Sequence, residues 1–228
     1  MQEKILKYSR TSVDKAGDIL RKNGESSAKE RINALDILSN WRASYNYPVN
    51  EFQARLRENV KSCQGDVIIA QRLKRTASIV AKLRRFSKMR LTQMQDIGGL
   101  RAVVYDTKSL YALRDVFIEN ESHHTLVDEN DYITKPRGSG YRGIHLIYRY
   151  NCDDSYGCNK HLLEIQLRTK LQHIWAMAVE TAGLFLDQSL KSSLGNTSVN
   201  GVIAAPTTPS QVMGFEARIA RVVVAANE

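Results

Sequence analysis

The chain has 228 residues, of which 43% are hydrophobic and 25% charged, and its formal net charge is +9. These proportions are typical of a globular protein that can bury a core, and no run of about 18 apolar residues indicates a membrane span. The first residues lack the apolar centre of a signal peptide, so we expect a cytoplasmic protein without a membrane partner. The three cysteines fit no zinc-binding spacing. The excess of positive charge indicates a polyanionic partner.

The first 65 residues predict an N-terminal helical arm. Two helices are expected within residues 12–45, with a break at Asn23-Gly24 and a new start at Ser26-Ser27. Pro48 is expected to open a third helix, because apolar residues recur after it at helical spacing.

The segment 67–86 predicts a further helix, and this helix carries positive charge. No acidic residue occurs between positions 66 and 96, whereas a solvated helix face usually mixes both signs. Lys74, Ser78 and Lys82 are spaced at i, i+4 and i+8, so they would form one polar row. Such a row could hold a linear polyphosphate, which favours a phosphate-binding surface over an ordinary solvated face.

The rest of the chain predicts an α+β domain. After position 98 the pattern indicates a strand, a helix, three strands and a helix, at 100–104, 108–119, 124–133, 141–150, 161–169 and 170–186. We therefore expect a mixed, largely antiparallel sheet flanked by helices. Residues 1–65 are assigned to the arm, 66–190 to this domain, and 191–228 to a linker and a short C-terminal helix.

Polar side chains on two of these strands are expected to meet in one cleft. Side chains alternate between the two faces of a strand, so Tyr141 and His145 share a face behind a loop rich in Pro, Gly and Ser. Glu164, Gln166 and Arg168 share a face for the same reason, with apolar residues between them.

The acids and cations of the chain suit a transferase that acts on a magnesium-bound nucleotide. Mg²⁺ needs one or two carboxylates, which Asp96 and Glu164 could supply, and takes its other ligands from water and phosphate. Lysine and arginine would position the phosphates and neutralise charge, while a carboxylate or imidazole removes a proton from the acceptor hydroxyl. The chain contains no P-loop, no HExxH motif and no serine nucleophile elbow.

Four ordered segments resemble the synthetase domain of the RelA/SpoT family, the alarmone synthetases: RLKRTASIVAKL, MQDIGGLRAVV, DYITKPRGSGYRGIHLIY and EIQLRTKLQHIWA. The resemblance implies a nucleotidyltransferase-like fold and an ATP:3′-hydroxyl pyrophosphokinase. Such an enzyme moves the β,γ-pyrophosphate of ATP to a ribose 3′-hydroxyl and releases AMP.

Carried over by position, the resemblance implies a role for each polar residue of the motifs. Arg72 and Arg101 would hold the adenine of ATP between their guanidinium planes, and Lys74, Ser78 and Lys82 would hold its phosphates.

The same resemblance implies the reacting and acceptor-binding groups. Asp96 would bind Mg²⁺, and Glu164 would share the metal or act as the base on the 3′-hydroxyl. Tyr141 would stack on the base of the acceptor, Arg137 and His145 would hold its phosphate or ribose, and Gln166 and Arg168 would support Glu164. Arg137 stands where the family usually has lysine, and Ser139 where asparagine is common.

Two acceptors and one non-catalytic role remain open. The acceptor could be GDP or GTP, which gives the alarmones ppGpp or pppGpp, or the 3′-CCA end of tRNA, as in toxic members of the family. We expect the alarmone reaction first, with tRNA as the alternative and a neutralising antitoxin or a homo-oligomer as possible partners. A non-catalytic RNA-binding or regulatory module is the third hypothesis, although such a module would not need two metal-binding acids.

Overall fold

The computed structural model describes residues 6–22, 24, 26–63, 65–119, 123–152 and 158–185. The predicted linker and C-terminal helix at 191–228 lie outside these residues. Within the described part of the chain, no helix has both the length and the apolar character needed to cross a bilayer.

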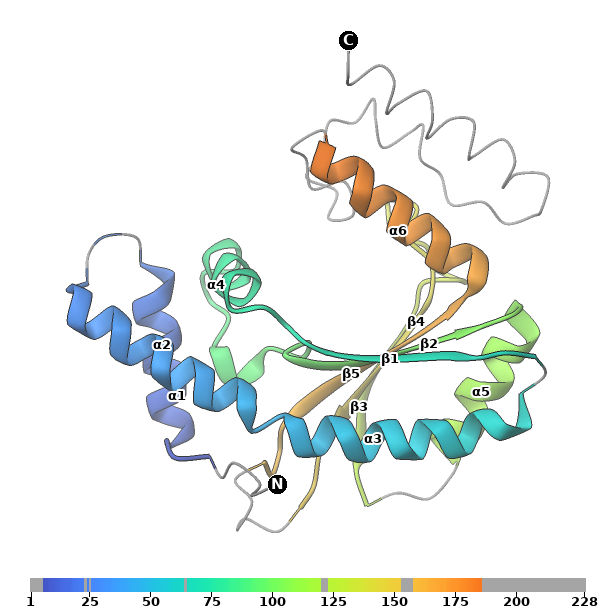
Figure 1. Cartoon of the computed structure of the whole chain (residues 1–228), viewed down its shortest axis with the longest axis horizontal. Coiled ribbons are helices and arrows are strands. Elements are labelled where there is room, and N and C mark those ends of the chain that lie inside the picture. Colours follow the sequence, from blue (N-terminus) through green and yellow to red (C-terminus); the bar gives the residue numbers. More distant parts are fainter. Residues whose placement is uncertain are drawn as a thin grey trace.

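Three helices form the N-terminal arm (Figure 1): α1 Arg10–Arg21, α2 Ala28–Ala43 and α3 Asn46–Asn59, followed by the 3-10 turn η1 Val60–Ser62. The predicted separation of the first two helices is confirmed. Ser27 caps α2 by a reciprocal pair of hydrogen bonds: its Oγ accepts from the Glu30 backbone N–H, and the Glu30 carboxylate accepts from the Ser27 N–H.

The five strands form one sheet in the order β1-β2-β5-β4-β3: β1 Ile68–Leu73, β2 Gly98–Val104, β3 Thr125–Asp131, β4 Ile144–Arg149 and β5 Leu162–Thr169. Strands β2 and β5 pair in parallel, and the other neighbouring pairs are antiparallel. The remaining elements are α4 Thr76–Arg85, η2 Leu91–Gln93, α5 Thr107–Glu119 and α6 Lys170–Phe185. The predicted α+β class and the mixed, largely antiparallel sheet are confirmed.

The single helix predicted over 67–86 is wrong in its first half. Residues 68–73 form the edge strand β1, which pairs with β2 from Ile68↔Val103 to Leu73↔Gly98. The exposed fraction of Ile68 is 53%, so this residue does not belong to a buried helix face. The helix α4 begins only at Thr76.

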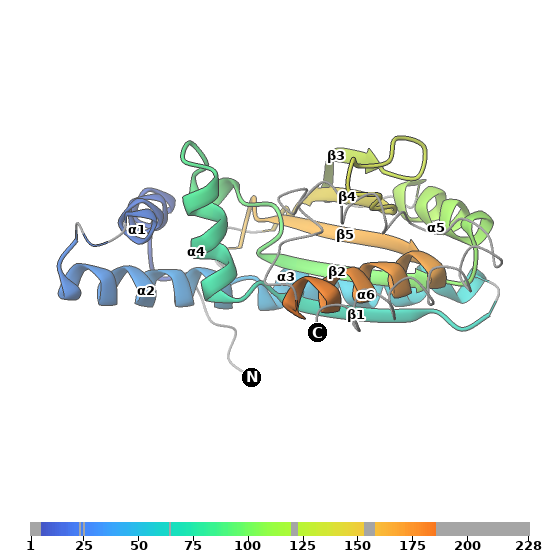
Figure 2. The same cartoon turned by 90° about the horizontal axis from the view of Figure 1, so that it is seen from above.

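The helices cover the two faces of the sheet differently. In Figure 1, α3 and α5 lie on one side of the sheet, and α4 and α6 lie on the other. Figure 2 shows β1 and β3 as the two edges, with β2, β5 and β4 between them. The polar residues predicted to meet in one cleft lie on the face that α4 and α6 flank.

One hydrophobic cluster joins the arm to the sheet. Trp41, Tyr45 and Phe52 from the arm are fully buried and belong to the same cluster as Leu100 of β2 and Ile165 of β5. The arm therefore packs as part of the core that supports the cleft.

Candidate active site

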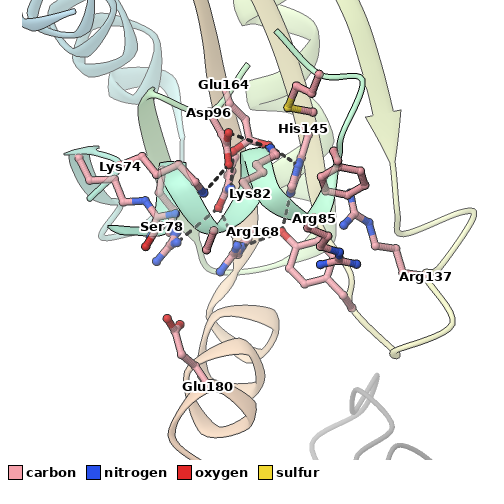
Figure 3. Close-up of a pocket in the computed structure, with 17 residues that line it drawn as sticks. Lys74, Ser78, Lys82, Arg85, Asp96, Arg137, His145, Glu164, Arg168 and Glu180 are labelled. Atoms are coloured by element: carbon pink, nitrogen blue, oxygen red, sulfur yellow. Dashed lines mark hydrogen bonds and ion pairs between the residues drawn. The ribbon is translucent and has the colours of Figure 1, made fainter. Parts of the chain in front are cut away.

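One cleft of about 960 Å³ gathers every residue that the sequence singled out for the site. It opens between α4, α6 and the strands β1, β2, β4 and β5 (Figure 3). The predicted residues that line it are Arg72, Lys74, Ser78, Lys82, Asp96, Arg101, Arg137, Tyr141, His145, Glu164, Gln166 and Arg168.

Asp96 lies between two lysines in the turn that leads into β2. Its Oδ2 is 2.7 Å from the Nζ of Lys74, and its Oδ1 is 2.9 Å from the Nζ of Lys82. Burial opposes ionisation of this carboxyl, but Lys82 and Lys74 outweigh burial and hold the pKa of Asp96 below its ordinary value. Asp96 is thus an anion with both oxygens in contact with a cation.

Lys74 was predicted to lie on the same helix as Ser78 and Lys82, but it contacts Asp96 from a position outside that helix. It lies between β1 and α4, where its N–H donates to the Ile97 carbonyl at 2.8 Å and extends the pairing of β1 with β2. The Nε–H of Arg42 also donates to the Lys74 carbonyl at 2.8 Å. Ser78 and Lys82 do lie one turn apart on α4, so the row consists of two helical residues and one loop residue.

Glu164 points into the cleft from β5 and is held by two neighbours. Its Oε1 is 2.8 Å from the Nδ1 of His145, and its Oε2 accepts from the Nε2 of Gln166 at 2.7 Å. Burial acts to raise the pKa of Glu164, but the hydrogen bond and charge of His145 lower it below the ordinary value. The negative charge of Asp96 acts in the opposite direction, so the two carboxylates lie close enough to repel each other.

Tyr141, His145 and Arg168 form a buried hydrogen-bonded chain behind Glu164. The Tyr141 hydroxyl is 2.6 Å from the Nε2 of His145 and accepts from the Nε of Arg168 at 3.1 Å. Arg168 also donates to the Gln166 amide oxygen at 2.6 Å. Tyr141 precedes β4, which begins at Ile144, so its predicted place within the strand is wrong, although its hydroxyl still meets His145.

Arg72 and Arg101 are diagonal neighbours on one face of the β1–β2 pair. Arg72 pairs with Gly99, and Arg101 pairs with Ala70, so the two arginines are offset by two residues. Such diagonal neighbours lie roughly 7–8 Å apart, which leaves room for a flat ring between two guanidinium planes. Arg72 lies on a strand and not on the predicted helix.

Arg137 packs against Tyr132, a residue that the sequence motifs did not predict for the site. The Arg137 guanidinium carbon lies 4.1 Å from the centroid of the Tyr132 ring, and its Nη2 donates to the Tyr132 hydroxyl at 2.5 Å. The ring of Tyr132 also lies edge-on to Tyr141 and His145. Tyr132 therefore orients a cation of the cleft without lining it.

Further residues line the cleft that the motifs did not predict: Ala81, Arg85, Phe86, Met89 and Glu180. Arg85 belongs to the segment between positions 66 and 96 that contains no acidic residue, and Phe86 beside it is 43% exposed. Glu180 occupies a polar position of an amphipathic helix, where the sequence pattern does not distinguish a cleft residue from a solvated one.

The family model described as "Region found in RelA / SpoT proteins" matches residues 71–184, which is half of the chain. The chain belongs to the RelA/SpoT family. This matched region contains all of the residues that line the cleft, from Arg72 to Glu180.

Similarity to individual RelA/SpoT proteins covers part of each sequence. The chain is 34% identical to the GTP pyrophosphokinase YjbM of Bacillus subtilis over 110 residues, which is 47% of this chain and 52% of that protein. It is 31% identical to the GTP pyrophosphokinase YwaC of the same organism, again over 110 residues, 46% of this chain and 52% of that protein. The chain thus spans about half the length of the curated relatives it matches.

A solved structure shares the fold over a longer range. The small alarmone synthetase 1 from Bacillus subtilis, bound to its product pppGpp, matches with a TM-score of 0.62 and 23% identity. The match covers 83% of this chain and 95% of that chain. At this identity the likeness concerns the fold.

The carboxylates of the cleft fit a divalent cation. Asp96 and Glu164 face the same space and repel each other, so a cation between them would relieve that repulsion. Both oxygens of Asp96 contact lysines, and a ligand phosphate would have to draw at least one lysine away before Asp96 could bind a metal. Oxygen donors of this kind suit Mg²⁺.

Proposed function

We propose that the chain is an ATP:nucleotide 3′-pyrophosphokinase that transfers the β,γ-pyrophosphate of ATP to the 3′-hydroxyl of GDP or GTP and releases AMP. The observation that carries this proposal is that the cleft has two chemically different halves, one beside Asp96 and one beside Glu164. Cations of β1, α4 and the turn between them lie on the side of Asp96, and an aromatic and imidazole cluster lies on the side of Glu164. The pyrophosphokinase names of the relatives from Bacillus subtilis support the same reaction.

The donor half of the cleft binds ATP. Arg72 and Arg101 hold the adenine ring between them, and Lys74, Ser78 and Lys82 hold the phosphates. When ATP enters, its phosphates replace Asp96 as the partner of the two lysines. This exchange frees the Asp96 carboxylate and neutralises charge on the phosphates at the same time.

The acceptor half holds the nucleoside whose 3′-hydroxyl reacts. The acceptor base stacks on Tyr141, and Arg137 and His145 bind its phosphate or ribose. His145 and Gln166 fix the Glu164 carboxylate from two directions, so one oxygen can be presented to the hydroxyl in a defined orientation.

The reaction breaks one phosphoanhydride bond and forms one ester bond. The 3′-oxygen attacks the β-phosphorus of ATP while its proton passes to Glu164. The bond from the β-phosphorus to the α,β-bridging oxygen breaks, and AMP leaves with that oxygen. Asp96 and Glu164 would hold Mg²⁺, which, when bound, neutralises charge on the transferred phosphates.

A tRNA 3′ end is the alternative acceptor, and one surface favours it. Exposed cations continue along the rim of the cleft beyond the ATP-binding residues, next to the exposed ring of Phe86. A second, shallower hollow shares Arg85, Phe86 and Met89 with the main cleft. Bases of a single strand could stack on this ring while its phosphates contact the cations Arg84, Arg85, Lys88 and Arg90.

The decisive assay uses ATP labelled at the β-phosphate, because label at this position moves only with the pyrophosphoryl group. The protein is incubated with Mg²⁺ and with GDP, GTP or bulk tRNA. Label in the small nucleotide supports alarmone synthesis, and label in RNA alone contradicts it and supports the tRNA alternative. Folded protein that transfers no label to any acceptor would favour the non-catalytic RNA-binding module.

Two substitutions test the assigned chemistry in the same assay. Glu164→Gln and Asp96→Asn should each lower transfer by about 10²–10⁴-fold, since one removes the base and the other a metal ligand. Glu58→Gln, on the exposed surface of α3, is the matched control and should leave transfer unchanged. Full activity in both cleft variants would contradict these roles.

A further inference from the structure

A third carboxylate, that of Glu180, faces the cleft and has no part in the proposed transfer of pyrophosphate. Glu180 lies on α6 and lines the cleft together with Asp96, in the turn before β2, and Glu164 of β5. Figure 3 shows its side chain pointing from α6 toward the cleft, on the side of Lys74 and Ser78 and away from Arg137. Glu180 therefore belongs to the donor half of the cleft.

The charge of Glu180 acts on one of the two arginines that bracket the proposed adenine position. Burial lowers the pKa of Arg101, and the like charges of Arg168 and Arg72 lower it further, whereas Glu180 raises it. The carboxylate is thus close enough to Arg101 to stabilise its charged form. A flat base between Arg72 and Arg101 would direct one of its edges toward α6.

We propose that Glu180 selects adenine as the donor base by accepting a hydrogen bond from the 6-amino group. This inference rests on the proposed function, since it requires ATP in the donor half of the cleft. A carboxylate offers acceptors only, so it matches the N–H₂ group that adenine carries at carbon 6. Guanine carries a carbonyl oxygen at that position, and two acceptors facing each other repel.

The same carboxylate could in principle accept from the N1–H and 2-amino groups of a guanine. That role would require Glu180 beside the acceptor base, near Tyr141 and Arg137. Its place on the Lys74 side and its effect on Arg101 favour the donor base instead.

The test compares ATP with purine riboside 5′-triphosphate, which has hydrogen in place of the 6-amino group. The wild-type protein should use ATP with a kcat/KM about 10- to 100-fold above that of the analogue, the effect of one hydrogen bond to a charged group. In Glu180→Ala the preference should fall to about onefold, because ATP loses activity and the analogue does not. Glu180→Gln, whose amide can also donate, should gain use of GTP as donor. Glu58→Gln is the control and should keep the wild-type preference.

Direct titration of ATP and of the analogue, without an acceptor, gives the same comparison independently of transfer. A wild-type protein that binds both triphosphates with the expected preference but transfers nothing would contradict the proposed function and support the role of Glu180. If Glu180→Ala lowers the affinity and the kcat/KM equally for ATP and for the analogue, the residue has a general electrostatic or structural role, and the inference is overturned. An unchanged preference in this variant would overturn it as well.

Discussion

Tyr141 contributes its ring and its hydroxyl to two different parts of the cleft. The hydroxyl joins His145 to Arg168, and through His145 it supports Glu164. Burial raises the pKa of Tyr141, although Arg168 acts in the opposite direction, so the phenol stays protonated near neutral pH. The ring lines the cleft with an exposed fraction of only 6%, so most of its surface is part of the packing.

Substitutions at Tyr141 should separate these two contributions. Tyr141→Phe keeps the ring but leaves the buried partners His145 and Arg168 without the hydroxyl, so we expect kcat to fall about tenfold, equivalent to about 1.4 kcal/mol, with little change in the KM of the acceptor. Tyr141→Leu should raise the acceptor KM by about tenfold or more, since base stacking is worth about 1–3 kcal/mol. Steady-state kinetics with varied acceptor at saturating ATP measure both. Equal effects of the two variants on KM would contradict the separation.

His161 makes stability depend on pH at a site remote from the chemistry. Its ring is fully buried and packs at a tilt against Trp41 and Tyr45, with ring centroids 4.3 and 4.4 Å apart. Its Nε2 lies 2.7 Å from the Ser44 hydroxyl. Burial lowers its pKa to about 3, and Arg10 acts in the same direction. Between pH 6.5 and this value the unfolded chain binds a proton that the folded chain does not, so stability must fall as the pH falls.

The contribution of His161 should be measurable as a slope. We expect it to remove about 1.4 kcal/mol from the free energy of unfolding per pH unit below about 6.5. Urea denaturation at pH 7, 6 and 5 gives this free energy. In His161→Gln the absolute stability is lower because of lost packing, but its decline with acid should be shallower than in the wild type. Parallel slopes for the two proteins would contradict the prediction.

At the level of elements, the local sequence pattern was sufficient where local interactions decide the structure. Ser27 could be recognised as the start of α2 because its capping partner Glu30 lies three residues away. Strand β1 was missed because its apolar residues also fit a helix, and its partner β2 lies about thirty residues further along the chain. Lys74 was nevertheless correctly predicted to lie in the cleft, because the turn before α4 places it beside Asp96. Glu180 could not be predicted as a cleft residue, because its position depends on how α6 packs against the sheet, and no local sequence pattern specifies that packing.

Gly98 shows how closely the arm approaches the sheet. A Cβ atom at this position would lie 2.6 Å from the Cδ1 of Tyr45 and 2.9 Å from the Cγ2 of Val49, both on the buried side of the arm. These distances are shorter than carbon atoms tolerate, and neither neighbour has free space into which to move. The entry to β2 therefore requires a residue without a side chain.

Gly98→Ala should destabilise the protein by about 1–3 kcal/mol, the usual effect of overpacking a core. For a domain of this size, that loss corresponds to a fall in Tm of roughly 2–4 °C per kcal/mol. Gly138→Ala is the matched control, because a Cβ there would have no neighbour within 4 Å. Thermal unfolding of the two variants beside the wild type provides the measurement. Equal Tm values for all three proteins would show that α3 can shift away from β2 without cost.

For the whole molecule, the arm supports the wall of the cleft that carries Phe86 and Met89. Arg21 of α1 donates to the carbonyl oxygens of Ser87 and Met89. Gly17 packs so closely on Leu91 that a Cβ at this position would lie 2.9 Å from the Leu91 Cβ. Helix α1 thus holds the segment 86–93 that follows α4, although the two are far apart in the sequence.

Asp14 adds to this support, and its contribution can be removed without changing a residue of the cleft. Its two carboxylate oxygens accept from the backbone N–H and the hydroxyl of Thr92 at 2.9 and 3.0 Å, and Thr92 is buried. Asp14→Ala leaves both donors without these acceptors, so we expect a loss of about 1–3 kcal/mol in stability. Faster amide hydrogen exchange in 86–93 and a severalfold higher KM for ATP should accompany this loss. Lys15→Ala, on the exposed face of the same helix, is the matched control and should change none of the three. A destabilised Asp14→Ala protein with unchanged exchange in 86–93 and an unchanged KM would mean that the arm stabilises the fold without shaping the donor half of the cleft.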